Sequence, residues 1–218
     1  MEFLYDDRAH AGRVLAGRLA RYAGRDDALV AGLPRGGVPV AYEVARALGA
    51  PLDVLVVRKL GVPNYPELAM GAVGPGDTVY LDRHIVAEAG VSPHEIDRVL
   101  AAERAELQRR EALYRGGRAP LVAEGRTAIV VDDGMATGAT MRVAVQLLRK
   151  GNAARIVVAV PVAPGDTVAR VAPLADEVIC AYVPRVFQGV GQFYGDFAQT
   201  ADAQVTELLA RSRVEPAE

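Results

Sequence analysis

The sequence has no tryptophan, a single cysteine at Cys180, and only two lysines, Lys59 and Lys150, among 25 basic residues. One cysteine excludes an intrachain disulfide framework and a zinc site built from several cysteines. No apolar run approaches the ~18 residues that a membrane span needs, and the acidic segment 1–7 lacks the apolar core of a secretory signal. With a net charge of −2, the composition disfavours a nucleic-acid-binding or anionic-membrane surface. We therefore expect a cytoplasmic protein.

Short apolar runs alternate with segments of helical periodicity along most of the 218 residues. This length suits one sizeable domain. Runs that are continuous in Val and Leu indicate strands covered on both faces. The alternation therefore predicts an α/β fold with an open, mainly parallel five-stranded sheet flanked by helices. The predicted strands are residues 29–33, 52–57, 126–132, 155–160 and 176–181, and the predicted helices are 7–22, 39–48, 137–150 and 202–210, with a short helix capped by Asp166 before the last strand.

Two regions interrupt this alternation. Residues 61–125 begin with a stretch rich in Pro and Gly, and continue into a charged helix opened by the capping box Ser92-Pro-His-Glu95. Residues 182–200 contain three of the four phenylalanines, separated by glycines. We expect one domain over residues 1–218, with a core at 24–60 and 126–181, an inserted lid and helix at 61–125, a small hood at 182–200 and a C-terminal helix at 201–212.

One strand-to-helix turn carries the strongest functional signal. The segment Ala128 to Thr140, Ala-Ile-Val-Val-Asp-Asp-Gly-Met-Ala-Thr-Gly-Ala-Thr, places two carboxylates at the end of a buried strand, followed by a small-residue turn and a helix. The N–H groups of such a turn and the helix dipole favour phosphate. A sugar phosphate explains the adjacent acids, because its hydroxyl groups can donate to Asp132 and Asp133. The alternative is an ordinary turn in which the two acids serve as a cap.

This segment resembles the binding motif for 5-phosphoribosyl 1-pyrophosphate (PRPP) of type I phosphoribosyltransferases, which has four apolar residues, two acidic residues and a turn containing Thr-Gly-x-Thr. The match has no gap, and the predicted strand order fits that family along most of the chain. The resemblance implies that Asp132 and Asp133 hold the ribose hydroxyls. It assigns the 5′-phosphate to Met135, Ala136, Thr137, Gly138, Ala139 and Thr140.

Two further segments suit the pyrophosphate end of such a substrate. The glycine-rich turn at residues 32–37 matches neither a nucleotide P-loop nor a dinucleotide fingerprint, and it resembles the family's pyrophosphate loop. Arg58 and Lys59 have no acidic neighbour in sequence and are expected to end the second strand, where ligands bind in open α/β sheets; the alternative is a solvent-exposed strand end. The candidate contacts in the loop are Arg35 and the backbone N–H groups of Gly36 and Gly37.

The resemblance implies that a nitrogen nucleophile displaces pyrophosphate from the ribose. Magnesium would be bound by the substrate, with no metal ligand directly from the protein. Ala136 stands where relatives acting on 6-oxopurines have an Asp, so we expect a nucleobase acceptor other than a 6-oxopurine, and no general base can be assigned. The lid would contribute Tyr65 and Glu67. The acceptor pocket would contain Phe187, Phe193 and Tyr194, whose alternative role is the small core of the hood.

The sequence thus predicts an enzyme, a phosphoribosyltransferase acting on PRPP and a nitrogenous acceptor, and the family implies a homodimer. The alternative is a non-catalytic sensor that keeps the sugar-phosphate site and regulates a partner. The intact pyrophosphate loop and the full-length lid favour the enzyme, because a sensor could lose both. A kinase that makes PRPP shares the motif, but the sequence has no ATP-site motif or internal duplication.

Overall fold

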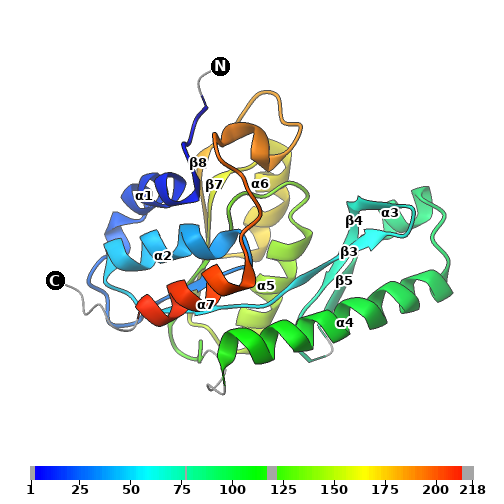
Figure 1. The fold of residues 1–218 in the computed structure, drawn as a ribbon, viewed down its shortest axis with the longest axis horizontal. Helices are drawn as coiled ribbons and strands as arrows, with labels where there is room; N and C mark the ends of the chain where they lie inside the picture. Colours follow the sequence, from blue (N-terminus) through cyan, green and yellow to red (C-terminus); the bar gives the residue numbers. More distant parts are fainter. Residues whose placement is uncertain (1–2, 77, 117–121, 213–218) are drawn as a thin grey trace.

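The computed structural model describes residues 3–76, 78–116 and 122–212 (Figure 1). Its central sheet is fully parallel and has the order β2-β1-β6-β7-β8, which confirms the predicted α/β sheet. The strands are β1 (Ala28–Gly32), β2 (Leu52–Val54), β6 (Thr127–Val131), β7 (Arg155–Val162) and β8 (Glu177–Tyr182).

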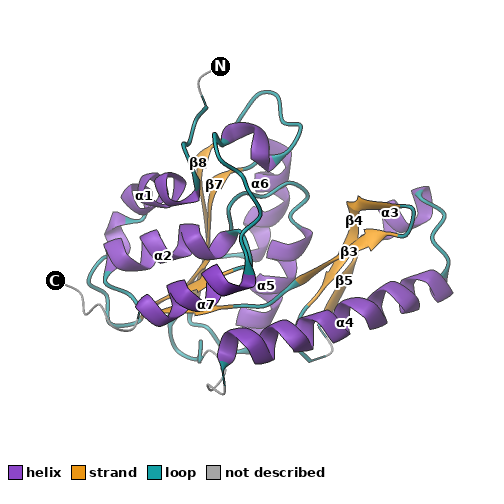
Figure 2. Ribbon diagram, in the orientation of Figure 1, coloured by secondary structure: helices purple, strands orange, loops and turns teal. Residues whose placement is uncertain are grey.

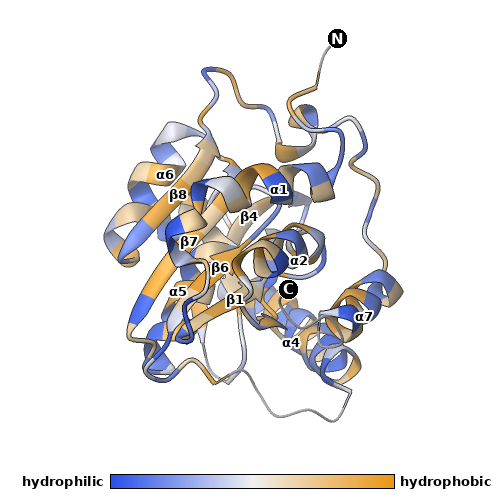
Figure 3. Cartoon of the chain, turned by 90° about the vertical axis from the view of Figure 1, so that its left-hand side faces the viewer, coloured by the Kyte–Doolittle hydropathy of each residue, from blue (hydrophilic) through white to orange (hydrophobic). Residues whose placement is uncertain are grey.

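Helices cover both faces of this sheet (Figures 1 and 2). Ile129 and Val131 belong to the apolar cluster under α1 and α2, whereas Ala128 and Val130 belong to the cluster under α5 and α6. All four side chains are fully buried, which explains why the strand is apolar without alternation. Figure 3 shows these hydrophobic strands between helices with hydrophilic outer faces. The helices are α1 (Arg8–Arg18) and α2 (Gly37–Leu48) on one face, and α5 (Ala139–Lys150) and α6 (Gly165–Val171) on the other.

The region between β2 and β6 forms a second, antiparallel sheet with two helices. The Pro- and Gly-rich stretch predicted as part of a lid forms a β-hairpin that turns at residues 63–64. The capping box is confirmed, because Ser92 and Glu95 exchange side-chain to backbone hydrogen bonds. This insertion is docked on α5: Lys150 Nζ donates to the buried Thr78 Oγ1 at 2.8 Å. Its elements are β3 (Arg58–Val62), β4 (Tyr65–Val73), β5 (Val79–Leu81), α3 (Arg83–Glu88) and α4 (Pro93–Arg115).

The second predicted strand, residues 52–57, is too long. Strand β2 ends at Val54, and after Leu55, whose N–H donates to the Gly32 carbonyl at 3.0 Å, the chain crosses to the second sheet. Val56 and Val57 remain buried during the crossing, so the apolar run continues although the strand does not. The prediction that Arg58 and Lys59 end a strand of the parallel sheet is therefore wrong, since they begin β3.

Other boundaries differ by a few residues. The prediction that Asp166 caps the short helix is wrong, because Pro164 is the N-cap and Asp166 lies in the first turn, where it pairs with Arg170 at 3.1 Å. Among the described residues, no helix combines the length and apolar character needed to cross a bilayer. The remaining elements are α7 (Asp202–Arg211) and the short helices η1 (Ala20–Tyr22), η2 (Ala172–Leu174) and η3 (Val190–Phe193).

Candidate functional site

The fold brings the two glycine-containing turns to one place. β1 and β6 are neighbours, and Gly32 at the end of β1 pairs with Val131 at the end of β6. β1 continues into α2 on one face of the sheet, and β6 into α5 on the other. Connections that leave on opposite faces open a crevice at the carboxyl ends of parallel strands. The predicted pyrophosphate loop and the predicted sugar-phosphate turn thus flank the same crevice.

Two glycines of the first turn lie directly against the acid pair. A Cβ on Gly36 would be 2.0 Å from Asp133 Oδ2, and a Cβ on Gly37 would be 2.8 Å from the Asp132 Cα. Real Cβ atoms do not approach other heavy atoms this closely. Glycine is therefore required here by the proximity of the two turns.

The acid pair is electrostatically unfavourable without a ligand. Burial, followed by the charge of Asp133, raises the pKa of Asp132 well above its ordinary value. Burial also raises the pKa of Asp133, against a lowering effect of the Arg8 guanidinium. Asp132 Oδ1 accepts one hydrogen bond, from the Asp133 N–H at 2.9 Å. Hydroxyl donors or a cation supplied by a ligand would stabilise the ionised pair.

This electrostatic arrangement predicts the pH dependence of stability. An acid with a raised folded-state pKa contributes stability that is complete below its ordinary value, 3.8 for Asp132, and is lost as pH rises through the folded pKa. The ligand-free protein should therefore lose stability as pH rises above about 4, and Asp132→Asn should flatten this slope. Urea unfolding at several pH values between about 4 and 8 measures both slopes.

Glu106 supplies a control for this measurement. The Arg109 side chain, then Arg110, lowers the pKa of Glu106 to about 2, so its stabilising contribution is lost only at pH values below its ordinary range. Glu106→Gln is thus the control that alters stability above about pH 5 without altering the slope there. Equal slopes for wild type and Asp132→Asn would contradict the electrostatic account.

Arg8, at the start of α1, supplies a cation that no sequence pattern indicated. Its Nε donates to Asp133 Oδ2 at 2.8 Å and its Nη1 donates to the Ala198 carbonyl at 2.7 Å. Its guanidinium carbon lies 4.0 Å from the centre of the Phe197 ring. The two members of the ion pair are 125 positions apart. The one available signal was indirect, namely that buried carboxylates need a counter-charge.

The turn after the acid pair is anchored from two sides. The Met135 N–H donates to the Val162 carbonyl at 3.0 Å, and the Met135 side chain is buried. Thr167 Oγ1 donates to the Ala136 carbonyl at 2.7 Å. Strand β7 and helix α6 therefore fix the turn.

The same turn presents unpaired donors. Gly138 caps α5 in the left-handed conformation, with φ of +80°, which glycine adopts without strain. Its neighbour Ala139 is held locally, by a 3.4 Å bond from its N–H to Thr137 Oγ1. In the described part of the chain, the turn N–H groups that donate no hydrogen bond are those of Ala136, Thr137, Gly138 and Thr140. Free donors at the start of a 12-residue helix favour a phosphate group.

The three cations predicted to bind pyrophosphate all have acidic neighbours. Arg35 is the one located in the loop beside the acid pair, whereas Arg58 and Lys59 lie on β3 of the insertion. The Gly37 N–H is already bonded within the loop, to the Leu33 carbonyl at 3.0 Å. The acidic partners of Arg35, Arg58 and Lys59 are Asp202 at 3.7 Å, Glu103 at 2.7 Å and Glu67 at 3.4 Å, respectively.

Tyr194, predicted in the acceptor pocket, is buried instead at 2% exposure. Its ring packs against Tyr5 at 5.3 Å and Phe197 at 5.0 Å between ring centres. Its hydroxyl donates to the Asp133 backbone carbonyl. Tyr194 therefore belongs to the core that joins the hood to the N-terminal segment. Its hydroxyl also fixes the backbone of Asp133.

Phe187 and Phe193 form an aromatic cluster with Tyr182, and Phe193 also packs against the core that contains Tyr5 and Tyr194. Phe193 stacks on Phe187 with ring centres 5.8 Å apart and meets the edge of Tyr182 at 5.9 Å. The hood also reaches the turn, because a Cβ on Gly134 would be 2.4 Å from a methyl group of Val190. This cluster remains the hood's candidate for contact with an acceptor.

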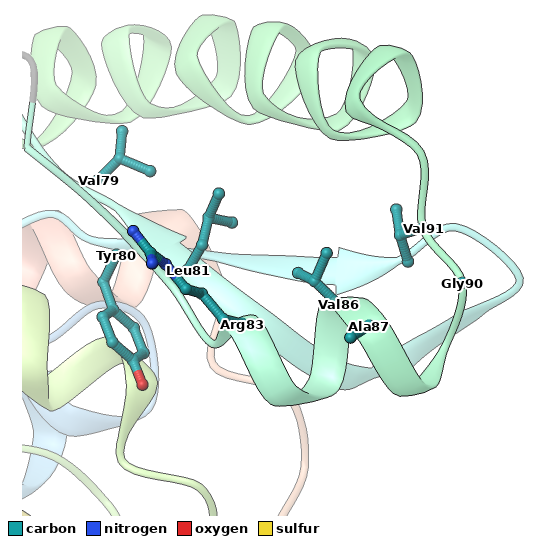
Figure 4. A pocket seen from close by; sticks show the side chains of 8 residues that line it. All are labelled: Val79, Tyr80, Leu81, Arg83, Val86, Ala87, Gly90 and Val91. Atoms are coloured by element: carbon teal, nitrogen blue, oxygen red, sulfur yellow. The ribbon is translucent and has the colours of Figure 1, made fainter.

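The insertion contains a groove of about 670 Å³ lined by β5, α3 and the loop that precedes α4 (Figure 4). The two lid residues predicted to contact substrate, Tyr65 and Glu67, lie on the exposed half of β4 and do not line it. The groove is mainly apolar and is lined by Val79, Tyr80, Leu81, Arg83, Val86, Ala87, Gly90 and Val91.

Among the described residues, no group of three or more His, Cys, Asp or Glu side chains could hold a metal ion.

Comparison with known proteins agrees with this geometry. The family model described as "Phosphoribosyl transferase domain" matches residues 4–190. The chain is 50% identical over 215 residues to a Mycobacterium tuberculosis protein provisionally named a phosphoribosyl transferase, Rv0571c of strain H37Rv, covering 99% of this chain and 48% of that protein. The chain thus spans about half the length of the curated relatives it matches.

Two solved structures are similar to this chain in fold. The protein TT1426 from Thermus thermophilus is 42% identical, with a TM-score of 0.77 over 95% of this chain and 98% of that chain. AQ2163 from Aquifex aeolicus, 12% identical, has a TM-score of 0.52 over 93% of this chain and 84% of that chain. The second similarity, at this low identity, concerns the fold alone.

Proposed function

The chain belongs to the phosphoribosyl transferase family, and on this basis we propose that it transfers the 5-phosphoribosyl group from PRPP to a nitrogenous acceptor and releases pyrophosphate. One observation supports the proposal most strongly. The free N–H groups of the turn at residues 136–140, the acid pair and the Gly36 loop lie together at the carboxyl ends of β1 and β6. These are the three chemistries needed for the phosphate, the ribose hydroxyls and the diphosphate of one substrate.

We assign the substrate groups as follows. The 5′-phosphate accepts from the free N–H groups of the turn and from the hydroxyls of Thr137 and Thr140. Met135 and Ala139 support this site indirectly, because their N–H groups are already bonded. The ribose hydroxyls donate to Asp132 and Asp133. The diphosphate is bound by Arg35 and by the N–H of Gly36, which donates no hydrogen bond within the described residues.

The reaction forms a bond from an acceptor nitrogen to the anomeric carbon and breaks the bond from that carbon to the pyrophosphate oxygen. The electron pair leaves with pyrophosphate, and positive charge develops on the ribose. The acid pair can stabilise this charge while Arg35 of the loop stabilises the leaving group. Magnesium carried by the substrate beside Asp132 and Asp133 would supply positive charge that stabilises the departing pyrophosphate. The fixed turn orients the ribose for attack.

The acceptor is a planar base other than a 6-oxopurine in this proposal. Ala136 provides no carboxylate at the position that faces the base in 6-oxopurine enzymes, and its side chain is exposed. Phe187 and Phe193 offer aromatic surface in the hood. The Tyr194 face is not available, because the ring is buried.

Pyrophosphate release tests this function. We expect the protein, supplied with PRPP and magnesium, to release pyrophosphate faster with one base of a panel of purines, pyrimidines and their carboxylated forms than without any base. Hypoxanthine and guanine should give no acceleration. Binding of PRPP without acceleration by any base would instead favour the non-catalytic sensor. The full-length relatives should be assayed in parallel, since this chain spans about half of their length.

A further inference from the structure

Arg8 lies where three parts of the proposed site meet. Its Nε is 2.8 Å from Asp133 Oδ2 and 3.1 Å from the position that a Cβ on Gly36 would occupy. Its Nη1 is bonded to the Ala198 carbonyl of the segment that follows the hood. One side chain thus touches the acid pair, the loop proposed for the diphosphate and the C-terminal segment.

The Arg8 guanidinium has N–H groups that these contacts do not use. It has five N–H groups, and two of them donate to Asp133 and Ala198. The other three donate no hydrogen bond to a described residue, although the side chain is only 13% exposed. Unpaired N–H groups of a largely buried cation are unfavourable. A ligand with several anionic oxygens would satisfy them.

The position of Arg8 also argues against a purely structural role. Arg8 is the first residue of α1, and the helix dipole disfavours a cation in the first turn. Phe197 orients the guanidinium at 4.0 Å, while the ring also contacts Tyr194 at 5.0 Å. The Phe197 ring therefore packs against both Tyr194 and Arg8, and it fixes the position of the Arg8 guanidinium.

We propose that Arg8 is a binding residue for the diphosphate of the PRPP-type substrate. Its Nε stays bonded to Asp133, which the Tyr194 hydroxyl also anchors through the Asp133 backbone carbonyl, and its remaining N–H groups donate to diphosphate oxygens beside Gly36. As the bond to the anomeric carbon breaks, negative charge grows on the departing pyrophosphate, and the guanidinium next to it becomes more stabilising. This inference rests on the proposed function and adds a contact outside the two family-like turns.

Comparing the binding of two ligands distinguishes a diphosphate-binding role of Arg8 from a purely structural role. PRPP with magnesium carries the diphosphate, whereas ribose 5-phosphate carries the same phosphate and ribose without it. We expect Arg8→Gln to weaken PRPP binding by about 10- to 100-fold, the loss of a charged hydrogen-bonding group, and to change ribose 5-phosphate binding by less than about 3-fold. Arg13→Gln, an exposed arginine of the same helix, should bind both ligands like the wild type. Calorimetric titration measures all of these affinities.

Arg8→Lys extends the test if Arg8→Gln does not fold, which thermal unfolding would reveal. Lysine keeps the charge but cannot hold Asp133 and the diphosphate in one planar geometry, so PRPP affinity should fall less than in Arg8→Gln and ribose 5-phosphate affinity should again be unchanged. An equal loss for both ligands, or no loss for either, would overturn the proposal in both variants. If the wild type binds ribose 5-phosphate but not PRPP, the proposed function fails, independently of Arg8.

Discussion

Replacing Asp132 and Asp133 together with asparagine is expected to abolish measurable binding of PRPP with magnesium, a loss of about 100-fold or more. Each carboxylate would accept a hydrogen bond from a ribose hydroxyl, and charged hydrogen bonds contribute about 1.5–3 kcal/mol each. An amide lacks this charge, so it also attracts the substrate-bound magnesium less strongly. Calorimetric titration of wild type and double variant with PRPP and magnesium measures the loss.

The same variant is expected to unfold at a higher temperature than the wild type. Burial raises the pKa of both acids, so their ionised forms destabilise the folded state near neutral pH. Asparagine removes that charge, although it also removes the partner of Arg8. A site that binds less ligand while the protein becomes more stable is characteristic of residues selected for function.

This combination distinguishes the two interpretations of the acid pair. If Asp132 and Asp133 merely capped a turn, asparagine would cap it about equally well, and both the melting temperature and PRPP binding would stay nearly unchanged. Asp26→Asn is the matched control, because this exposed acid precedes β1 at the opposite end of the strand, and it should change neither quantity. Undiminished PRPP binding by the double variant would make the motif a generic phosphate-binding turn.

The parts of the site that the sequence predicted are local in the chain. Strand β6, its two acids and the small-residue turn before α5 lie within 24 consecutive positions, Thr127–Lys150. Apolar continuity, glycine and a helical period are sufficient to place them. The loop at residues 33–36 follows the same logic, because it connects β1 to α2.

The parts that the sequence did not predict depend on contacts between distant segments. Arg8 reaches Asp133 across 125 positions, and the Tyr194 hydroxyl reaches the Asp133 carbonyl across 61. Such pairs leave no periodic signal in a single sequence. The end of β2 was misplaced for a related reason, since Val56 and Val57 stay buried although they lie outside both sheets. Burial and strand formation coincide in most apolar runs, but not in this crossing.

Gly36→Ala is expected to have the second largest effect, because it adds one methyl group at the centre of the site. Gly36 has φ of −61° and ψ of −31°, so alanine can adopt its backbone conformation without strain. The added Cβ would nevertheless lie 2.0 Å from Asp133 Oδ2, and the carboxylate would have to move away from Arg8. Overpacking of this kind costs about 1–3 kcal/mol, and we expect PRPP affinity to fall at least about 10-fold.

Gly17→Ala separates this steric effect from the general effect of replacing glycine. Gly17 lies in the last turn of α1, and a Cβ there would meet nothing within 4 Å. Alanine should stabilise that helix by up to about 1 kcal/mol and leave PRPP binding unchanged. Urea unfolding and calorimetry on both variants give the comparison. If Gly36→Ala, like Gly17→Ala, left PRPP affinity unchanged, the close contact between the Gly36 loop and Asp133 would not matter for binding. The crevice would then not be the binding site for PRPP.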